Sequence, residues 1–246
     1  MKYKFTFPLK DPLILNTSYN HILQAALLTW LNDKNYQSFL HDTGYEAGKR
    51  SYKLFSFSRI FGKHRIIPEQ HKIIYQDQIH FYISSYDSKF VTYLAENIIS
   101  QSQLNINNTY LTPSSFETIA EEYDDQCEIQ TLSPICIYST LVNFEGVKKT
   151  YYYTPYEQEF SELVRKNLIH KYESYYGYSP ENSQFQIKPL NRFCRESVLF
   201  YKKTVIKGWN GKFLLSGSKE LMDMAVNAGV GSKNSQGFGC VIVNKG

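Results

Sequence analysis

The chain has 246 residues, of which 42% are hydrophobic and 20% charged, and its formal net charge is +4. This length suits one large domain or two small ones of about 100–150 residues each, and the hydrophobic share excludes wholesale disorder. No stretch reaches the roughly 18 apolar residues of a membrane helix, and Lys2–Phe7 alternates like a strand rather than a signal peptide. The four cysteines lack CxxC spacing and indicate buried thiols in a reduced compartment, so we expect a cytoplasmic protein.

The charge is unevenly distributed along the chain. Residues 1–124 hold 12 basic and 12 acidic residues, whereas residues 125–246 hold 15 and 11, so the whole excess lies in the second half. An excess on one half favours binding to phosphates, although small excesses are also common on ordinary soluble surfaces. Aromatic residues make up 16% of the chain, which suits base stacking as well as core packing.

The first half predicts the order β-α-β-β-α-β. Lys2–Phe7 alternates polar and apolar residues as a strand does, and Ser18–Leu31 has one apolar helical stripe with Ser18 as its N-cap. The other expected elements are a strand over Tyr52–Ile60, a hairpin of Lys72–Tyr75 and Gln78–Ser84 that turns at Gln76-Asp77, a helix over Lys89–Ile99 and a strand over Tyr110–Thr118.

The acidic run Glu121–Asp125 predicts a boundary, after which the order repeats. The expected elements of the second half are strands over Glu128–Leu132, Ile135–Tyr138 and Lys149–Tyr153, a helix over Glu157–Tyr175, strands over Ser183–Lys188, Arg195–Ile206 and Lys212–Gly217, a helix capped by Ser218 that runs to Ala228, and a strand over Phe238–Val243. Two such units predict an α+β fold of two tandem ferredoxin-like, RRM-like βαββαβ domains, residues 1–124 and 125–246. These folds present an open sheet face or an inter-domain cleft.

A glycine-rich loop between the last helix and the last strand is the most specific local feature. Four glycines lie within eleven residues, so backbone amides there could approach a phosphate closely and form an anion-binding nest. Lys233 adds a cation, and Ser232, Asn234 and Ser235 add neutral donors. The order helix-loop-strand excludes a Rossmann fingerprint, and no GK[ST] opens a helix as in a P-loop. A plain glycine-rich turn explains the same spacing equally well.

The loop GVGSKNSQGFGCVIV resembles the C-terminal glycine-rich loop of the CRISPR-associated repeat-RNA endoribonuclease family, part of the RAMP superfamily. Further segments resemble that family in the same order along the chain: Tyr19-Asn20-His21, Phe39-Leu40-His41, the run from Tyr52 to Ser58, and the run from Glu159 to Leu168. The resemblance therefore spans essentially the whole chain. It implies tandem ferredoxin-like domains with a cleft between them, an RNA-binding glycine loop, and cleavage of precursor CRISPR RNA within its repeats.

The chemistry that this resemblance implies requires no metal and no cofactor. RNA carries its own nucleophile, the 2′-OH, whose attack on the adjacent phosphorus leaves a 2′,3′-cyclic phosphate and a 5′-OH. The reaction needs a base, positive charge for the phosphorane oxygens and a proton donor, which histidine, lysine and backbone amides can supply. The six histidines show no HExxH or Cys/His ligand spacing, so a metal site is not expected.

His41 and Lys53 are the expected catalytic residues. The resemblance places the family's general acid/base histidine at His41, in a loop after the first helix, and its phosphate-stabilising lysine at Lys53. Lys49 and Arg50 compete with Lys53 for that role. The catalytic tyrosine that some members carry in the first helix is missing here, and Tyr36 could replace it only if its loop folds back.

The expected RNA contacts combine the glycine loop with a basic, aromatic stretch of the second half. They are Gly229, Gly231, Ser232, Lys233, Asn234, Gly237, Arg192, Arg195, Lys202 and Lys203. Alternating basic and aromatic residues are also typical of an exposed hairpin. Whether the last four of these residues contact RNA therefore stays open. His21 is interpreted as orienting the first helix, and His80 and His170 as structural.

Two other functions fit the same sequence. One is a catalytically inactive RNA-binding or scaffold protein of this fold, which the presence of His41 and Lys53 disfavours. The other is an unrelated ferredoxin-like protein for a small ligand, which the glycine loop and the ordered motifs disfavour. The expected partner is CRISPR repeat RNA and no membrane is involved. Delivery to a CRISPR effector complex stays open, as does the choice between monomer and homodimer.

Overall fold

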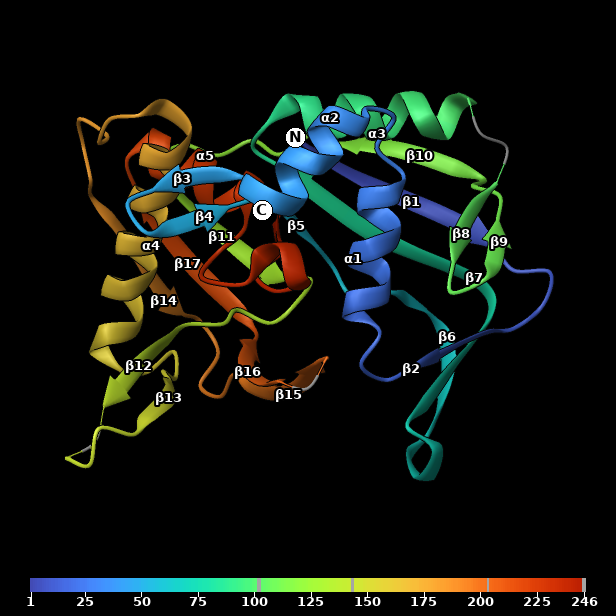
Figure 1. Cartoon of the computed structure of the whole chain (residues 1–246). Helices are drawn as coiled ribbons and strands as arrows, with labels where there is room; N and C mark the ends of the chain where they lie inside the picture. The colour runs from blue at the N-terminus through green and yellow to red at the C-terminus, as the bar shows by residue number, and fades with distance from the viewer. Residues whose placement is uncertain (101–102, 143, 203, 245–246) are drawn as a thin grey trace.

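The computed structural model of the protein describes residues 1–100, 103–142, 144–202 and 204–244. Figure 1 shows the N-terminal half, blue to green, beside the C-terminal half, yellow to red, each built around its own sheet. Strand β5 (Phe55–Phe57) packs against the short 3-10 turn Asn234–Gln236 of the glycine-rich loop, so the two halves meet at that loop.

The N-terminal sheet has the strand order β10-β1-β7, with β5, β6 and β2 paired along β7. All of these pairings are antiparallel. The elements of this half are β1 (Lys2–Pro8), β2 (Leu13–Asn16), α1 (Asn20–Thr29), β5, β6 (Phe61–Ile67), β7 (Lys72–Ser85), α3 (Ser88–Ser100) and β10 (Ser115–Ile119). Strand 1 lies between strands 3 and 4 of the unit, which is the ferredoxin-like arrangement. The predicted strand at Lys2–Phe7 and helix at Lys89–Ile99 are confirmed.

The predicted hairpin at Gln76-Asp77 is wrong. Residues 72–85 form one long strand, β7, and the chain instead turns at the 3-10 segment Pro68–Gln70, which joins β6 to β7. Asp77 has the left-handed φ of 61°, and the register of β6 shifts between Gly62 and His64. Asp tolerates this conformation both in turns and in bulged strands, so the local pattern did not distinguish the two.

Three further boundaries in this half differ from the prediction. Ser18 does not cap α1: the N-cap position is Tyr19, without a side-chain cap bond. The strand predicted over Tyr52–Ile60 is confined to Phe55–Phe57, because Leu54 has φ 51° and separates β5 from β4 (Arg50–Tyr52). The strand predicted over Tyr110–Thr118 divides into β9 (Thr109–Leu111), which pairs with β8 (Leu104–Ile106), and β10. Pro113 lies between them and offers no N–H to a ladder.

The C-terminal sheet has the strand order β14-β17-β11-β18, again fully antiparallel. Its elements are β11 (Gln126–Thr131), α4 (Gln158–Tyr176), β14 (Phe185–Pro189), β17 (Lys212–Gly217), α5 (Lys219–Ala228) and β18 (Val241–Val243). The order repeats the ferredoxin-like arrangement, which confirms the tandem α+β fold. Ser218 caps α5 as predicted, with its Oγ 3.4 Å from the N–H of Leu221.

Two hairpins project from this second unit. They are β12 (Tyr138–Val142) with β13 (Lys148–Tyr152), and β15 (Arg195–Tyr201) with β16 (Thr204–Asn210). The single strand predicted over Arg195–Ile206 is therefore wrong, since the chain reverses after Tyr201, where Lys202 has φ 54°. The strand predicted over Ile135–Tyr138 reduces to isolated bridges, among them Ile135 to Trp209.

The remaining elements lie between α1 and β5 in sequence, and the last of them contacts α4 of the second unit. They are α2 (Lys34–Ser38), a π-helical turn over Phe39–Thr43, and the short hairpin of β3 (Tyr45–Ala47) with β4. Across the units, the Ser84 hydroxyl donates to the carbonyls of Val226 and Asn227 at 3.1 and 2.9 Å, and Leu54 packs into the C-terminal core. None of the described helices combines the length and apolarity needed to cross a bilayer. The domain boundary at residue 124 and the cytoplasmic location stay predictions.

Candidate active site

The glycine-rich loop runs from the end of α5 to β18 and is held from within by Asn234. The Asn234 side-chain amide donates to the carbonyls of Val230 and Phe238, at 3.2 and 3.1 Å. Lys233 adopts the left-handed φ of 61° that opens the 3-10 turn, and its ammonium lies 5.0 Å from the Tyr138 ring centroid. The loop therefore has one defined shape, with Lys233 at its tip.

Asn20 connects this loop to the N-terminal unit. Its Nδ2 donates to the carbonyls of Gln236 and Gly237, at 2.9 and 3.3 Å, and its Oδ1 accepts a hydrogen bond from Arg59. The Tyr19-Asn20-His21 motif thus positions the glycine loop against α1. His21 bonds through Nδ1 to the Ser18 carbonyl at 3.0 Å, and its orienting role at this helix end stays a prediction.

All three glycines predicted to contact RNA, Gly229, Gly231 and Gly237, are buried. A Cβ on Gly237 would lie 2.6 Å from Asn20 Nδ2 and 2.7 Å from the Phe57 ring, and one on Gly229 would lie 2.8 Å from Ser56 Cβ. Both residues have positive φ. Their contacts give them a role in packing the loop, and their contact with RNA stays a prediction.

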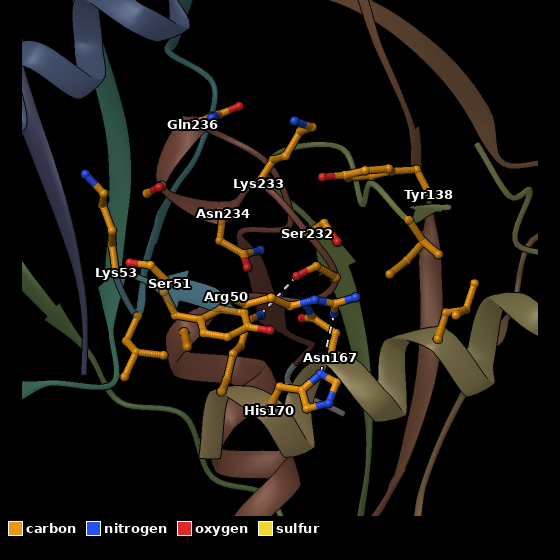
Figure 2. A pocket seen from close by; sticks show the side chains of 18 of the residues that line it. Arg50, Ser51, Lys53, Tyr138, Asn167, His170, Ser232, Lys233, Asn234 and Gln236 are labelled. Carbon is orange, nitrogen blue, oxygen red and sulfur yellow. Dashed lines mark hydrogen bonds between the residues drawn. The ribbon is translucent and has the colours of Figure 1, made fainter. Parts of the chain in front are cut away.

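A cleft of about 830 Å³ opens between the glycine loop, β4 and α4, and we call it the central cleft. Figure 2 shows loop residues Ser232, Lys233 and Asn234 on one side and Asn167 and His170 of α4 on the other. Its described lining contains no carboxylate and five lysine or arginine side chains: Arg50, Lys53, Lys166, Lys171 and Lys233. Such a lining attracts polyanions, although Glu162, which lies outside the lining, pairs with Lys166 at 3.4 Å.

Arg50 and His170 meet across this cleft, with Arg50 Nη1 3.5 Å from His170 Nδ1. The histidine predicted to be structural therefore lines the cleft. Arg50, named as a competitor of Lys53, faces this histidine, whereas Lys49 lines neither of the two hollows described here. Sequence reasoning also missed Lys166 and Lys171, because helix periodicity does not reveal which lysine faces a loop far along the chain.

A second hollow of about 780 Å³ adjoins the central cleft, and we call it the His41 chamber. Lys53, Ser235 and Gln236 line both hollows, so they form one continuous depression. The other chamber residues that carry polar groups are His21, Gln24, Thr29, Gln37, Ser38, His41, Asp42, Tyr201 and Lys202. The chamber thus gathers two histidines, two lysines and a tyrosine from both ferredoxin-like units.

His41 and Lys53 come together in this chamber. His41 lies in the π-helical turn, its side chain is 77% exposed, and its Nδ1 lies 2.7 Å from Asp42 Oδ1. Lys53 Nζ lies 3.4 Å from the His41 carbonyl oxygen. Partial burial lowers the pKa of Lys53, and the Asp42 carboxylate opposes that effect. An imidazole bonded through Nδ1 leaves Nε2 for proton exchange with a substrate.

The tyrosine missing from α1 is not replaced by Tyr36. That phenol is buried and donates to Asp87 Oδ2 at 2.5 Å, outside the chamber. Tyr201 of the β15–β16 hairpin lines the chamber instead, and its hydroxyl donates to Gln24 Oε1 of α1. Burial raises the pKa of Tyr201, so its phenol stays protonated as a hydrogen-bond donor. The only feature of the sequence that pointed to Tyr201 was its position among basic residues.

The other predicted RNA contacts divide into three groups. Gly231, Ser232, Lys233 and Asn234 line the central cleft, and Lys202 lines the His41 chamber. Arg192 and Arg195 line neither hollow. Lys203 lies outside the described residues. Among the described residues, no three His, Cys, Asp or Glu side chains gather closely enough to hold a metal ion.

The chain thus combines two tandem ferredoxin-like units that share a basic cleft beneath a glycine-rich loop. Residues 14–114 match the family model described as CRISPR-associated protein Cas6, N-terminal, and residues 116–243 match that of CRISPR associated protein Cas6, C-terminal. The chain therefore belongs to the Cas6 family, which confirms the resemblance seen in its sequence.

Similar proteins span nearly the whole chain. A Pyrococcus furiosus protein named as a CRISPR-associated endoribonuclease-like protein Cas6 is 31% identical, over 95% of this chain and 94% of its own. The CRISPR-associated endoribonuclease Cas6 1 of Methanocaldococcus jannaschii is 25% identical, over 91% and 86%. A solved structure described as a Cas6-related gene from P. furiosus aligns with a TM-score of 0.84 and 25% identity, over 100% of this chain and 98% of that one.

Proposed function

We propose that this protein is an endoribonuclease that cuts precursor CRISPR RNA within its repeats, without a metal ion, by attack of a 2′-OH on the adjacent phosphate. The observation that carries the proposal is the pairing of His41 with Lys53 in a chamber that opens into the carboxylate-free central cleft. The name of the Methanocaldococcus jannaschii relative, a CRISPR-associated endoribonuclease that matches over 91% of this chain, supports it.

The central cleft binds the RNA backbone. Its lysine and arginine side chains replace counterions that the phosphates release, so affinity falls steeply with salt. The hydroxyl of Ser232 and the amide of Asn234 add neutral groups on the loop side of the same cleft. Because Lys53, Ser235 and Gln236 border both hollows, a strand that follows the cleft delivers a phosphate to the His41 chamber.

The cleavage step forms a bond from the 2′-oxygen to phosphorus and breaks the bond from phosphorus to the 5′-oxygen. One proton leaves the 2′-OH and another reaches the departing 5′-oxygen. His41 Nε2 carries out one of these transfers, with Nδ1 held by Asp42, and solvent water exchanges the other proton. Lys53 offsets the negative charge that grows on the phosphorane oxygens. The products are a 2′,3′-cyclic phosphate and a 5′-OH.

The test uses repeat RNA transcribed from the CRISPR array of the source genome. The protein is incubated with it in excess EDTA, and the product ends are determined by mass spectrometry. One site-specific cut with a cyclic phosphate is expected, and a single 2′-deoxy substitution at the cut site should abolish cutting while binding persists. A 3′-OH product or strict Mg²⁺ dependence would overturn the mechanism. Tight binding without cutting would support the inactive RNA-binding protein instead.

A further inference from the structure

Lys171 lies beneath the glycine-rich loop and is buried, with 2% of its surface exposed. Its Nζ donates to the carbonyls of Gly229 and Gly231, at 2.6 and 3.0 Å. The lysine belongs to α4, so these bonds connect that helix to the start of the loop, about 60 residues later. One side chain thus donates hydrogen bonds to two main-chain carbonyls of the loop.

No acidic partner accompanies this ammonium among the described residues. Burial alone lowers the pKa of Lys171, to about 7. The titratable groups that line the cleft around it are Lys166 and His170 of its own helix, Arg50 and Tyr52 of β4, Lys53, Tyr138 of β12 and, from the loop, Lys233. Helix α5 contributes only the apolar Ala228 to this lining. The protein itself supplies no countercharge, so a charged Lys171 is costly until an anion enters the cleft.

A second polar side chain beside Lys171 has an atom without a hydrogen-bond partner. Asn167, one turn earlier on α4, is buried, and its Oδ1 finds no donor among the described residues. It lines the central cleft together with Lys171. The floor of the cleft therefore holds both an amine without a countercharge and an amide oxygen without a donor. A ligand with an anionic group and hydroxyls, such as RNA, fits these two needs.

We propose that Lys171 is a positioning residue that shapes the glycine-rich loop for RNA phosphates and takes up a proton when a phosphate binds above it. This inference rests on the proposed RNA-binding function. It adds that pH regulates the affinity for RNA. Above neutral pH the free protein holds Lys171 as a neutral amine, and a phosphodiester in the cleft favours the ammonium. Because binding then consumes a proton, RNA affinity falls as pH rises from 7 to 9.

The first experiment measures RNA affinity by fluorescence anisotropy at pH 6, 7, 8 and 9 and constant ionic strength, with repeat RNA blocked by a 2′-deoxy group at the cut site. Wild-type affinity should fall about tenfold more between pH 7 and 9 than that of Lys171→Met. The Lys171→Arg variant, whose guanidinium stays protonated, should bind with little change over this range. The same pH dependence in wild type and Lys171→Met would overturn the inference.

Lys166→Met is the matched control, because Lys166 lies on the same helix and lines the same cleft but is exposed. It should bind RNA more weakly at every pH and keep the wild-type pH dependence. A merely structural role for Lys171 predicts lower affinity without any change in pH dependence.

A second measurement needs no variant. Calorimetric titration of the wild-type protein with the blocked RNA at pH 8, in two buffers of different ionisation enthalpy, counts the protons taken up. Uptake approaching one proton is expected from the Lys171 amine. Zero uptake overturns the inference even where Lys171→Met does not fold. A protein that cuts repeat RNA without proton uptake loses only this inference, whereas one that binds no RNA at any pH loses the proposed function as well.

Discussion

Lys53 and His41 are joined by a hydrogen bond from the Lys53 ammonium to the His41 backbone carbonyl, 3.4 Å away. The two residues stand on opposite sides of the β3–β4 hairpin in sequence, and the chain between them returns to place both in one chamber. The bond uses the His41 main chain, so the imidazole stays free for its contact with Asp42. This geometry makes separate roles for the two residues testable.

His41→Ala should slow single-turnover cleavage of repeat RNA at least about a hundredfold, because a lost proton-transfer group costs about 10²–10⁴-fold. RNA affinity should change little, since the exposed imidazole lies outside the central cleft. Single-turnover rates at saturating protein check the first point and anisotropy the second. His64→Ala is the matched control, because His64 is exposed and lines neither hollow. A wild-type rate for His41→Ala would move catalysis to another residue.

Lys53→Ala should also slow the cut, by about 10²-fold, because a cation beside the developing phosphorane is lost. The double variant His41→Ala/Lys53→Ala should be less defective than the product of the two single effects, since both groups serve one transition state. The measurement is a double-mutant cycle on single-turnover rates. Lys49→Ala, which removes an exposed neighbour that lines neither hollow, should cut at the wild-type rate. Strict additivity would argue for independent roles.

Tyr201→Phe should lower the cleavage rate about tenfold, because one hydrogen bond that closes the chamber between the β15–β16 hairpin and Gln24 is lost. The ring packing stays in place, so thermal stability should change little. Tyr152→Phe is the control: it removes a hydroxyl that donates to Val205 of the same hairpin at 2.9 Å, outside the chamber. Equal rates for the two variants would exclude a role for the Tyr201 phenol.

Gly237→Ala should destabilise the fold by about 1–3 kcal/mol, because its Cβ would meet Asn20 and the Phe57 ring at under 3 Å and φ is 85°. Urea unfolding measures the effect. The control Gly146→Ala has a similar φ of 79° but open space around its Cβ, so only backbone strain of about 1 kcal/mol is expected. Similar losses in both variants would show that the packing against Asn20 and Phe57 contributes nothing.

The stability of the RNA-free protein should rise with pH through Lys171. Its pKa is about 7 when folded and about 10.4 when unfolded, so the unfolded chain binds more protons between these values. The contribution of Lys171 to the free energy of unfolding is fully present above about pH 10.4. It is lost as pH falls through 7. Urea unfolding at pH 7 and 9 should therefore show wild-type stability rising relative to Lys171→Met, by up to about 1.4 kcal/mol per pH unit. A constant difference would contradict the burial of a titrating amine.

Local periodicity was enough to predict most elements of both units. The alternation of Lys2–Phe7 and the apolar stripe of Glu157–Tyr175 correspond to β1 and α4, because side chains repeat every 2 residues in strands and every 3.6 in helices. The prediction was wrong where the same residue type is compatible with two backbone conformations. Asp77 predicted a turn and forms a bulge, and the strand predicted through Lys202 is a hairpin.

The sequence by itself determined the two ferredoxin-like units, the place of the glycine loop and, through its resemblance to a known family, His41 and Lys53 as candidates. Only the tertiary structure decided which groups meet. Lys171 lies under carbonyls about 60 residues away, Tyr201 reaches Gln24 from the other unit, and Arg50 faces His170. Periodicity predicts that a face is buried but not which segment covers it, because long-range packing brings that segment there.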